Sequence, residues 1–398
     1  MIPYIKTMKI NTNSQKIKEV LTRSVENIYP NREALEEILK SGKKIRLYNG
    51  IDPTGKLHLG HLAVLRKLRQ FQDLGHEVIV LIGDFTAMIG DPTDKMAARK
   101  PLSRNQVLEN AKNYKKQIGK ILDFKKSNVK FMHNGEWTNK LKPIDLLKMF
   151  SHFTVARILE RDMFQKRIQE GKDILLHEFV YPVFQAYDSV IMDVDLEIGG
   201  NDQTFNMLRG RDLMKKMKNK EKFVITLKLL TDPTGKKMGK SEGNLVSLDE
   251  KPQEMFGKAM AWPDSLLEIG FELLTDIPLE KIKKTNPREA KASLAREIVS
   301  LCYDKRAAEK AEKEFDRIFK EKKIPTKISE IKILEKKISF PQLLVRMKFV
   351  SSKSEARRLI LQKGVKIDSL IESDWQKIIK IKKGTIIQVG KRKFAKII

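Results

Sequence analysis

The chain has 398 residues, with 79 Lys and Arg against 51 Asp and Glu, so its formal net charge is +28. A surplus of this size predicts attraction to a polyanion, either nucleic acid or an acidic membrane surface. The single cysteine excludes an internal disulfide framework and fits a reducing compartment, so we expect a cytoplasmic protein. No stretch approaches the ~20 consecutive apolar residues of a membrane-spanning helix. The N-terminus lacks the apolar core of a secretory signal. This length predicts two or three domains.

Residues 45–62 are expected to organise the fold. Residues 45–51 are mostly apolar and predict a buried strand, and Asp52-Pro-Thr-Gly55 is typical of a turn. An amphipathic helix is predicted from His58, with apolar residues recurring up to Phe71. A strand, a polar turn and a helix N-terminus together favour phosphate, because unpaired N–H groups and the helix dipole point out of that end.

Two histidines, His58 and His61, lie on one face of the first turn of this helix. Gly60 between them leaves room for a flat ring near the backbone. The pair has three interpretations: polar residues at a helix start, zinc ligands, or donors to the phosphates of a nucleotide. Zinc is disfavoured, because the chain has one cysteine and only four other histidines. The rest of the chain favours the phosphate interpretation.

The residues after this helix predict a parallel sheet. Residues 77–83 form a continuous apolar run, typical of a strand that is covered on both faces. A strand, a helix and a strand over about forty residues form a βαβ unit, so we expect a doubly wound sheet. Ligands of such sheets bind beyond the carboxyl ends of the strands. Asp52 and Asp84 directly follow strand ends, and Asp91 lies in the loop beyond.

The connection from 84 to 103 is long, and long loops are often functional. Lys95 and Arg99 in this loop are either phosphate contacts or solvated charges. Helices are predicted within 104–122, 144–150, 155–169 and 177–189, and a strand at 129–133.

Tyr181, Gln185 and Asp188 recur on one face of the last of these helices. If buried, a phenol, an amide and a carboxylate would each need partners. The face is therefore either exposed to solvent, or lines a pocket that binds the ammonium group and a side-chain hydroxyl of an amino acid.

A predicted strand at 193–198 leads into Gly199-Gly-Asn-Asp-Gln203, followed by a helix over 204–217 and a strand at 223–227. Asp202 there either caps the helix or binds a ribose diol. Next comes Lys237-Met-Gly-Lys-Ser241 in a Gly-rich setting. This string predicts a mobile lysine pair that closes on a phosphoryl group, or an exposed solvated loop.

The remaining segments define the expected domain limits. Residues 1–44 are predicted as a solvated, partly helical lead-in, 45–247 as a catalytic domain with an inserted helical segment, 248–320 as a helical domain and 321–338 as a linker. Residues 339–398 hold 15 Lys and Arg against four Asp and Glu. Two short helices, at 340–347 and 354–362, and strands at 378–381, 385–389 and 394–398 predict a small α+β module. Its charge favours nucleic-acid contact over a merely solvated face.

Together these motifs resemble a bacterial-type tyrosyl-tRNA synthetase, a class I aminoacyl-tRNA synthetase. His58-Leu-Gly-His61 resembles the first signature of that class and Lys237-Met-Gly-Lys-Ser241 the second, in the right order. The resemblance covers nearly the whole chain. It implies an α/β fold with a doubly wound parallel-sheet, Rossmann-like catalytic domain, then an α-helical domain and a small α+β S4-like RNA-binding domain at 339–398.

The resemblance also implies roles for individual residues. Tyr48 and Asp188 match the pair that binds the phenol hydroxyl of the substrate tyrosine. The ammonium group would be bound by Tyr181, Gln185 and Asp91, and the substrate carboxylate would lie near Gln203. The implied ATP contacts are Asp52, Thr54, His58, Gly60, His61, Gly200, Asp202 and Lys240. The implied catalytic residues are His58, His61, Lys95, Arg99, Lys237, Lys240 and Ser241, with no metal held by the protein.

Two residues depart from the family pattern: Asn49 stands where some relatives carry Cys, and Gly239 replaces the commoner Ser. The implied reaction is activation of L-tyrosine by ATP with Mg2+, followed by transfer to tRNA(Tyr), in a homodimer. Three rivals stay open from the sequence: tryptophan activation, a non-enzymatic RNA-binding protein built on a lapsed synthetase, and an adenylyltransferase for a small metabolite.

Overall fold

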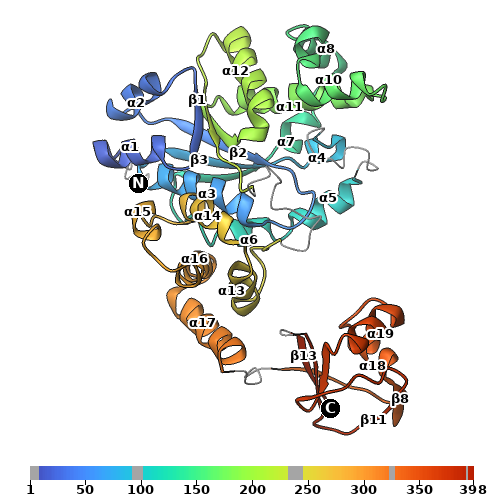
Figure 1. Ribbon diagram of the computed structural model, residues 1–398. Helices are drawn as coiled ribbons and strands as arrows, with labels where there is room; N and C mark the ends of the chain where they lie inside the picture. Colours follow the sequence, from blue (N-terminus) through green and yellow to red (C-terminus); the bar gives the residue numbers. More distant parts are fainter. Residues whose placement is uncertain (1–8, 92–101, 232–244, 322–327, 391–392) are drawn as a thin grey trace, which may run out of the picture. The chain divides into compact units, whose positions relative to one another are not determined.

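The computed structural model describes residues 9–91, 102–231, 245–321, 328–390 and 393–398. The chain divides into two compact units, unit 1 at Met1–Ala308 and unit 2 at Glu309–Ile398, drawn from blue to red along the sequence in Figure 1. Among the described residues, no helix is both long and apolar enough to cross a membrane.

A six-stranded sheet forms the centre of unit 1, in the order β1-β6-β5-β2-β3-β4. Five strands run parallel, and β1 is antiparallel to β6 at the edge. The strands are β1 Val25–Tyr29, β2 Arg46–Ile51, β3 Glu77–Ile82, β4 Val129–His133, β5 Leu196–Gly200 and β6 Phe223–Leu227. The doubly wound parallel sheet predicted from the sequence is confirmed.

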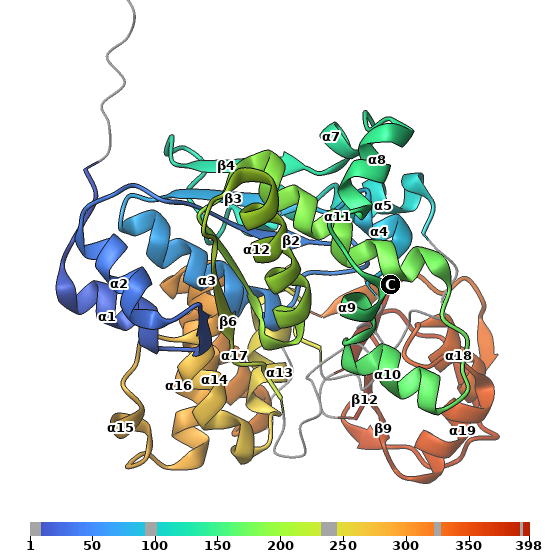
Figure 2. The same ribbon diagram turned by 90° about the horizontal axis from the view of Figure 1, so that it is seen from above.

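Helices cover both faces of this sheet. Helix α3 (Leu59–Asp73) connects β2 to β3, and α12 (Thr204–Lys218) connects β5 to β6, on the opposite face, where it packs on α11 (Leu176–Met192) (Figures 1 and 2). Right-handed crossovers that leave β2 and β5 in opposite directions place their helices on opposite faces. The strand order therefore reverses between β2 and β5, and ligands of such sheets bind at that reversal.

The N-terminal segment belongs to the sheet domain. It forms α1 (Ser14–Thr22), β1 and α2 (Arg32–Lys40), and β1 pairs with β6. Ile17, Leu35 and Leu39 are fully buried. The prediction of a solvated lead-in is wrong for residues 14–40, because the partner strand of β1 lies some 200 residues away and the local pattern offers few apolar positions.

Several predicted helices are shorter or divided. The stretch 155–169 contains α9 (Val155–Leu159) and α10 (Asp162–Gln169), and 104–122 contains α5 (Arg104–Ala111) and α6 (Tyr114–Ile118). Helix α11 continues to Met192, and Asp193 caps it with a left-handed backbone (φ 49°), so β5 begins later than predicted. The connecting helices are α4 Thr86–Ile89, α7 Gly135–Thr138 and α8 Pro143–Phe150.

The helical region after the sheet agrees with the prediction. Helices α13 and α14 pack on α16, and α14 also contacts α3. Its helices are α13 Pro252–Met260, α14 Leu267–Leu274, α15 Leu279–Ile282, α16 Pro287–Cys302 and α17 Lys305–Phe319. Two short 3-10 helices, η1 (Asn201–Gln203) and η2 (Asp264–Leu266), precede α12 and α14.

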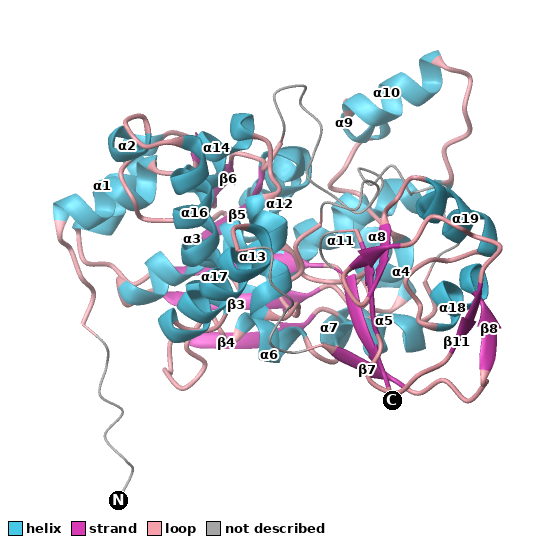
Figure 3. Cartoon of the chain, turned by 60° about the horizontal axis from the view of Figure 1, so that its bottom comes forward, coloured by secondary structure: helices cyan, strands magenta, loops and turns pink. Residues whose placement is uncertain are grey.

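Unit 2 begins within α17, and its described residues then form a five-stranded sheet in the order β10-β9-β12-β13-β7, a β11-β8 pair, and the helices α18 (Phe340–Arg346) and α19 (Lys353–Leu361). Its core includes Phe340, Leu344 and Ile360. The strands, drawn in magenta in Figure 3, are β7 Ser329–Ile331, β8 Lys337–Ser339, β9 Val365–Ile367, β10 Leu370–Ile371, β11 Ile378–Lys380, β12 Ile386–Val389 and β13 Lys393–Ile397.

The α+β character of the C-terminal module is confirmed, but four of its strands were not predicted. Two of them lie in the expected linker: β7 pairs with β13, and β8 pairs with β11. Each of these strands is three residues long and includes one charged residue, so its pattern does not distinguish it from a linker.

Candidate active site

The proposed phenol-binding pair lies in the interior, where β2 and α11 face each other. Tyr48 on β2 is 0% exposed and Asp188 on α11 is 3% exposed. The Tyr48 hydroxyl lies 2.9 Å from Ser189 Oγ. Asp188 accepts hydrogen bonds from Trp137 Nε1 at 2.8 Å and from Asn134 Nδ2 at 3.2 Å. The predicted face of α11 is therefore buried and polar, as a pocket requires, and not solvated.

Burial changes the acid–base character of these groups. Burial raises the pKa of Asp188 to about 8, against the hydrogen bonds from Asn134 and Trp137, which lower it. The pKa of Tyr48 is also raised, first by burial and then by the charges of Glu197 and Asp188. Asp188 therefore lies close enough to Tyr48 for its carboxylate form to raise the pKa of the phenol.

Asp52 links the predicted tyrosine contacts to the predicted ATP contacts. Its Oδ2 accepts from the Tyr181 hydroxyl at 2.9 Å, and its Oδ1 accepts from Thr86 Oγ1 at 2.7 Å. Burial raises the pKa of Asp52 to about 7. Thr54 belongs to the turn after Asp52 and donates its N–H to the Asp52 carbonyl at 2.8 Å.

The three predicted ammonium contacts are each hydrogen-bonded to a different group. Tyr181 is bonded to Asp52, whereas Gln185 Nε2 donates to Glu197 Oε1 at 3.0 Å. Asp91 accepts from Arg161 Nη2 at 2.8 Å and from Gln203 Nε2 at 2.7 Å. The structure thus joins Asp91 to Gln203 within the predicted set and adds Arg161, which the sequence did not indicate.

His58 and His61 form the N-terminus of α3. His58 is the N-cap, and its Nδ1 accepts the Gly60 N–H at 3.1 Å, while His61 Nδ1 accepts the His58 N–H at 3.2 Å. A ring nitrogen that accepts carries no proton, so each neutral ring has its proton on Nε2. Both histidines are thereby prepared as N–H donors. A Cβ on Gly60 would lie 2.9 Å from His58 Cε1, so a larger residue would push the His58 ring out of its capping position.

The segment that follows the second signature lies against the first. Leu59 N–H donates to the Val246 carbonyl at 3.2 Å, and Leu248 N–H donates to the Leu57 carbonyl at 2.9 Å. Ser247 forms a bridge with His58. Residues 57–59 and 246–248 are therefore held side by side by the backbone, although nearly 190 residues separate them.

The end of β5 carries the Gly-Gly-x-Asp-Gln segment. A Cβ on Gly200 would lie 2.5 Å from Asp202 Oδ1 and 2.9 Å from Leu229 Cδ2, so no larger residue fits without rearrangement. Asn49, one of the two departures from the family pattern, donates its amide to the Ile198 carbonyl at 2.8 Å and so ties β2 to β5.

Five of the predicted catalytic residues lie outside the described residues. They are Lys95, Arg99, Lys237, Lys240 and Ser241. Gly239 lies outside them as well.

A buried ion pair behind Tyr48 was not predicted. Lys222 is 0% exposed, is ion-paired with Glu197, and donates to Ser189 Oγ at 2.8 Å and to the Met207 carbonyl at 3.2 Å. Lys222 precedes β6 in a run of charged residues that is typical of an exposed turn, and Glu197 alternates with apolar residues as an exposed strand position does. Neither position carried a signal of burial.

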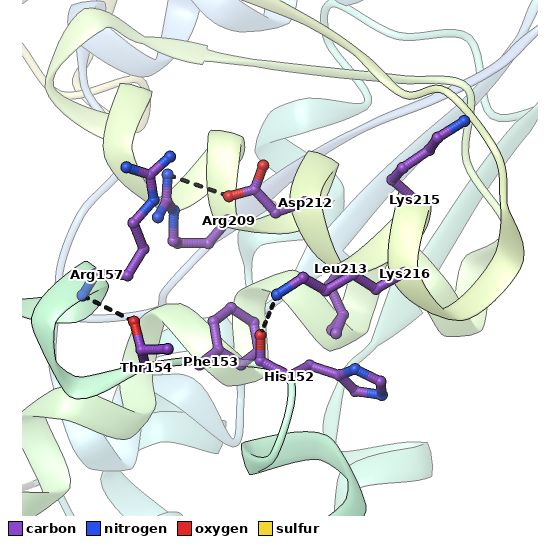
Figure 4. A pocket seen from close by; sticks show the side chains of 9 residues that line it. All are labelled: His152, Phe153, Thr154, Arg157, Arg209, Asp212, Leu213, Lys215 and Lys216. Carbon is purple, nitrogen blue, oxygen red and sulfur yellow. Dashed lines mark hydrogen bonds and ion pairs between the residues drawn. The ribbon is translucent and has the colours of Figure 1, made fainter.

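Among the described residues, no group of three or more His, Cys, Asp or Glu side chains is arranged to hold a metal ion. A cavity of about 390 Å3 lies elsewhere in unit 1, between the residues before and within α9 and those of α12 (Figure 4). Most of its polar lining is basic, and Arg209 pairs with Asp212 at 3.2 Å. It contains none of the predicted site residues.

Comparison with known proteins shows which family the chain resembles. Residues 40–320 match the family described as tRNA synthetases class I (W and Y), and residues 340–370 match the S4 domain. The chain is 46% identical over 400 residues to a tyrosine–tRNA ligase of Carboxydothermus hydrogenoformans, covering 96% of this chain and 97% of that one. It is 43% identical over 397 residues to a tyrosine–tRNA ligase of Thermotoga maritima, covering 97% and 98%.

Solved structures share the fold. A tyrosyl-tRNA synthetase of Archaeoglobus fulgidus, complexed with L-tyrosine, superposes with a TM-score of 0.59 at 22% identity, covering 76% of this chain and all of that one. A truncated mitochondrial tyrosyl-tRNA synthetase of Coccidioides posadasii gives a TM-score of 0.62 at 24% identity, covering 75% and 91%.

Proposed function

This chain belongs to the tyrosine–tRNA ligases, class I synthetases with an S4 domain, and we propose that the carboxyl ends of β2 and β5 form its tyrosine-activating site. The enzyme uses ATP to activate tyrosine and transfers the tyrosyl group to tRNA. In the first step an oxygen of the tyrosine carboxylate attacks the α-phosphorus of ATP, and pyrophosphate leaves. In the second step a ribose hydroxyl at the 3′ end of the tRNA attacks the tyrosyl carbonyl, and AMP leaves.

The observation that carries the site assignment is the buried pair of Tyr48 and Asp188 at the strand-order reversal. A phenol hydroxyl offers one donor and an acceptor, and this pair supplies a hydroxyl and a carboxyl group to match. Tyr181, Gln185 and Asp91 supply polar groups for the substrate ammonium, with Gln203 beside Asp91. Phenylalanine would leave the buried partners of the phenol without hydrogen bonds, which is costly.

The phosphate end of the substrate would lie at the N-terminus of α3. His58 and His61 present Nε2 donors there, beside the positive end of the helix dipole. The second signature ends five residues before Val246, which is hydrogen-bonded to Leu59. This proximity supports Lys237 and Lys240 as charges that stabilise pyrophosphate as it leaves, with Ser241 in the same loop. Lys95 and Arg99 would act from the loop after Asp91.

The ATP ribose would be bound by Asp202, next to Gly200, and Asp52 and Thr54 would complete the nucleotide site. Mg2+ would arrive with the triphosphate as part of the substrate. In phosphoryl transfer it neutralises charge on the phosphate oxygens.

The basic unit 2 would bind tRNA(Tyr). Its helix α19 presents Lys353, Arg357 and Arg358 to solvent, and all three lie within the residues matched to the S4 domain. We expect Arg358→Ala to weaken tRNA binding and reduce its salt dependence, with unchanged tyrosine activation. If Arg358→Ala keeps both the tRNA affinity and the salt dependence of the wild type, Arg358 does not contact the tRNA. We also propose that the protein works in the cytoplasm and that its domain limits are those predicted from the sequence, with a catalytic domain at 45–247, a helical domain at 248–320 and an RNA-binding domain at 339–398.

A homodimer would form through the region of α8 to α11. These elements pack around one apolar cluster, yet Leu147, Val155 and Leu176 are 65%, 72% and 80% exposed. Several exposed apolar side chains on neighbouring elements mark an interaction surface. Leu176→Glu should yield a monomer in sedimentation, whereas Leu334→Glu, at an equally exposed leucine of unit 2, should not. If Leu176→Glu still dimerises with the wild-type affinity, this surface is not the dimer interface.

The test of the tyrosine pocket is ATP–pyrophosphate exchange with tyrosine and with phenylalanine. Tyr48→Phe should lower kcat/KM for tyrosine about tenfold, as loss of one neutral hydrogen bond predicts, and leave that for phenylalanine nearly unchanged. Tyr114→Phe is the matched control, because it removes a buried hydroxyl that donates to the Gly55 carbonyl. A Tyr48→Phe enzyme with the wild-type ratio of the two substrates would refute the pocket.

A further inference from the structure

Lys222 lies behind the tyrosine pocket with three acceptors around its Nζ. They are a Glu197 carboxylate oxygen, Ser189 Oγ and the Met207 carbonyl oxygen. As the ion-pair partner of the Glu197 carboxylate, Nζ is an ammonium group, and its three hydrogens match these three acceptors. Lys222 is completely buried, so each of these bonds replaces a lost bond to water. Lys222 is therefore a fixed donor to Ser189.

This donation determines the direction of the next hydrogen bond. Ser189 is 0% exposed, and its described side-chain partners are Lys222 and the Tyr48 hydroxyl. If Tyr48 donated to Ser189, the Ser189 hydrogen would be buried with no acceptor among these described partners, which carries a free-energy cost. The arrangement without that cost has Ser189 donating to the Tyr48 oxygen. The Tyr48 hydrogen is then available for another acceptor.

Glu197 competes for that hydrogen. Its charge and its hydrogen bonding both raise the pKa of Tyr48, so its carboxylate faces the phenol. One oxygen of Glu197 is ion-paired with Lys222 and the other accepts from the Gln185 amide at 3.0 Å, so the negative charge of Glu197 is partly neutralised. The lysine thus has two effects: it orients Ser189, and it reduces the pull of Glu197 on Tyr48.

We propose that Lys222, Ser189 and Tyr48 form a directional hydrogen-bond chain that turns the Tyr48 hydroxyl into a donor toward the phenol oxygen of the substrate. The phenol then donates its own hydrogen to Asp188, so that both of its hydrogen bonds are satisfied. Lys222 and Ser189 are positioning residues that determine tyrosine specificity without touching the substrate. The inference rests on the tyrosine pocket proposed above.

The experiment measures ATP–pyrophosphate exchange with tyrosine and phenylalanine for Ser189→Ala, Tyr48→Phe and the double variant. Ser189→Ala should lower the tyrosine-to-phenylalanine ratio of kcat/KM about tenfold, through KM for tyrosine and with kcat nearly unchanged. In the Tyr48→Phe background, Ser189→Ala should change this ratio less than twofold, because the effects of two substitutions in one hydrogen-bond chain do not add.

Thr275→Ala is the matched control, since it removes a hydroxyl that is 1% exposed and makes two hydrogen bonds at the end of α14. It should leave the ratio unchanged. Lys222→Met with Glu197→Gln replaces the ion pair by neutral groups of similar size and avoids an unpaired buried charge. It should lower the ratio as Ser189→Ala does, with thermal unfolding as the check on folding.

Two results would overturn the proposed hydrogen-bond chain. In the first, Ser189→Ala lowers kcat/KM equally for tyrosine and phenylalanine. In the second, Ser189→Ala has the same effect with and without the Tyr48 hydroxyl. Failure of the pocket is distinguishable. If Tyr48→Phe alone keeps the wild-type ratio, the pocket is wrong. If Tyr48→Phe lowers the ratio and Ser189→Ala does not, the pocket is right and only the hydrogen-bond chain is wrong.

Discussion

The two halves of the proposed site are built differently. On the tyrosine side, Tyr48, Asp188 and Ser189 are at most 3% exposed. Their hydrogen bonds are made between side chains, from Tyr48 to Ser189 and from Asn134 to Asp188. On the phosphate side, His58 and His61 are half-buried and are held by backbone N–H groups. Choice among amino acids requires desolvated partners that are costly to leave unpaired. Binding of a triphosphate requires donors that a solvated anion can reach.

The largest effect should come from the phosphate side. His61→Ala removes a donor that would stabilise charge as pyrophosphate forms, and should slow adenylate formation by about 100- to 1000-fold. Tyrosine affinity should change little, because the tyrosine pocket is separate. Pre-steady-state adenylate formation and equilibrium tyrosine binding measure the two quantities. His177→Ala, at a half-buried histidine of α11, should affect neither. Comparable losses in rate and affinity would contradict the division between the two halves.

A smaller effect should appear in stability on the tyrosine side. Burial raises the pKa of Asp188 to about 8, from an ordinary value of 3.8. Between these values the folded protein holds a proton that the unfolded chain releases, so the free energy of unfolding falls as pH rises. From pH 6 to pH 8 this group should remove about 2 kcal/mol. Asp188→Asn has no carboxyl group to titrate, so between pH 6 and pH 8 its free energy of unfolding should rise by that amount relative to wild type.

Urea unfolding of the unliganded protein at the two pH values measures this change. Asp173→Asn, at an exposed carboxyl group, is the control and should follow wild type. If Asp188→Asn also follows wild type, Asp188 is not held in a desolvated site.

Sequence patterns predicted the parallel core of the fold. Residues 45–51 and 77–83 are apolar runs because both faces of β2 and β3 are covered, and the structure confirms both strands. Strand β1 was missed because its pairing with β6 is a long-range contact that no local pattern encodes.

The site residues also divide into those that the sequence indicated and those that only the fold brings together. The histidine pair was visible as a motif at a helix start. Tyr48 and Asp188 were identified through family resemblance, and both are buried in the structure. Lys222 and Glu197 were missed because, in sequence, a buried ion pair is indistinguishable from two solvated charges. Only the fold brings them together behind Tyr48.

The most direct test of the account is ATP–pyrophosphate exchange by Asp188→Asn with tyrosine and with phenylalanine as alternative substrates. If Asp188 accepts the phenol hydrogen in a closed pocket, kcat/KM for tyrosine should fall at least about tenfold while that for phenylalanine stays within about twofold. Equal losses for both amino acids would contradict the claim that this buried carboxyl group recognises the phenol.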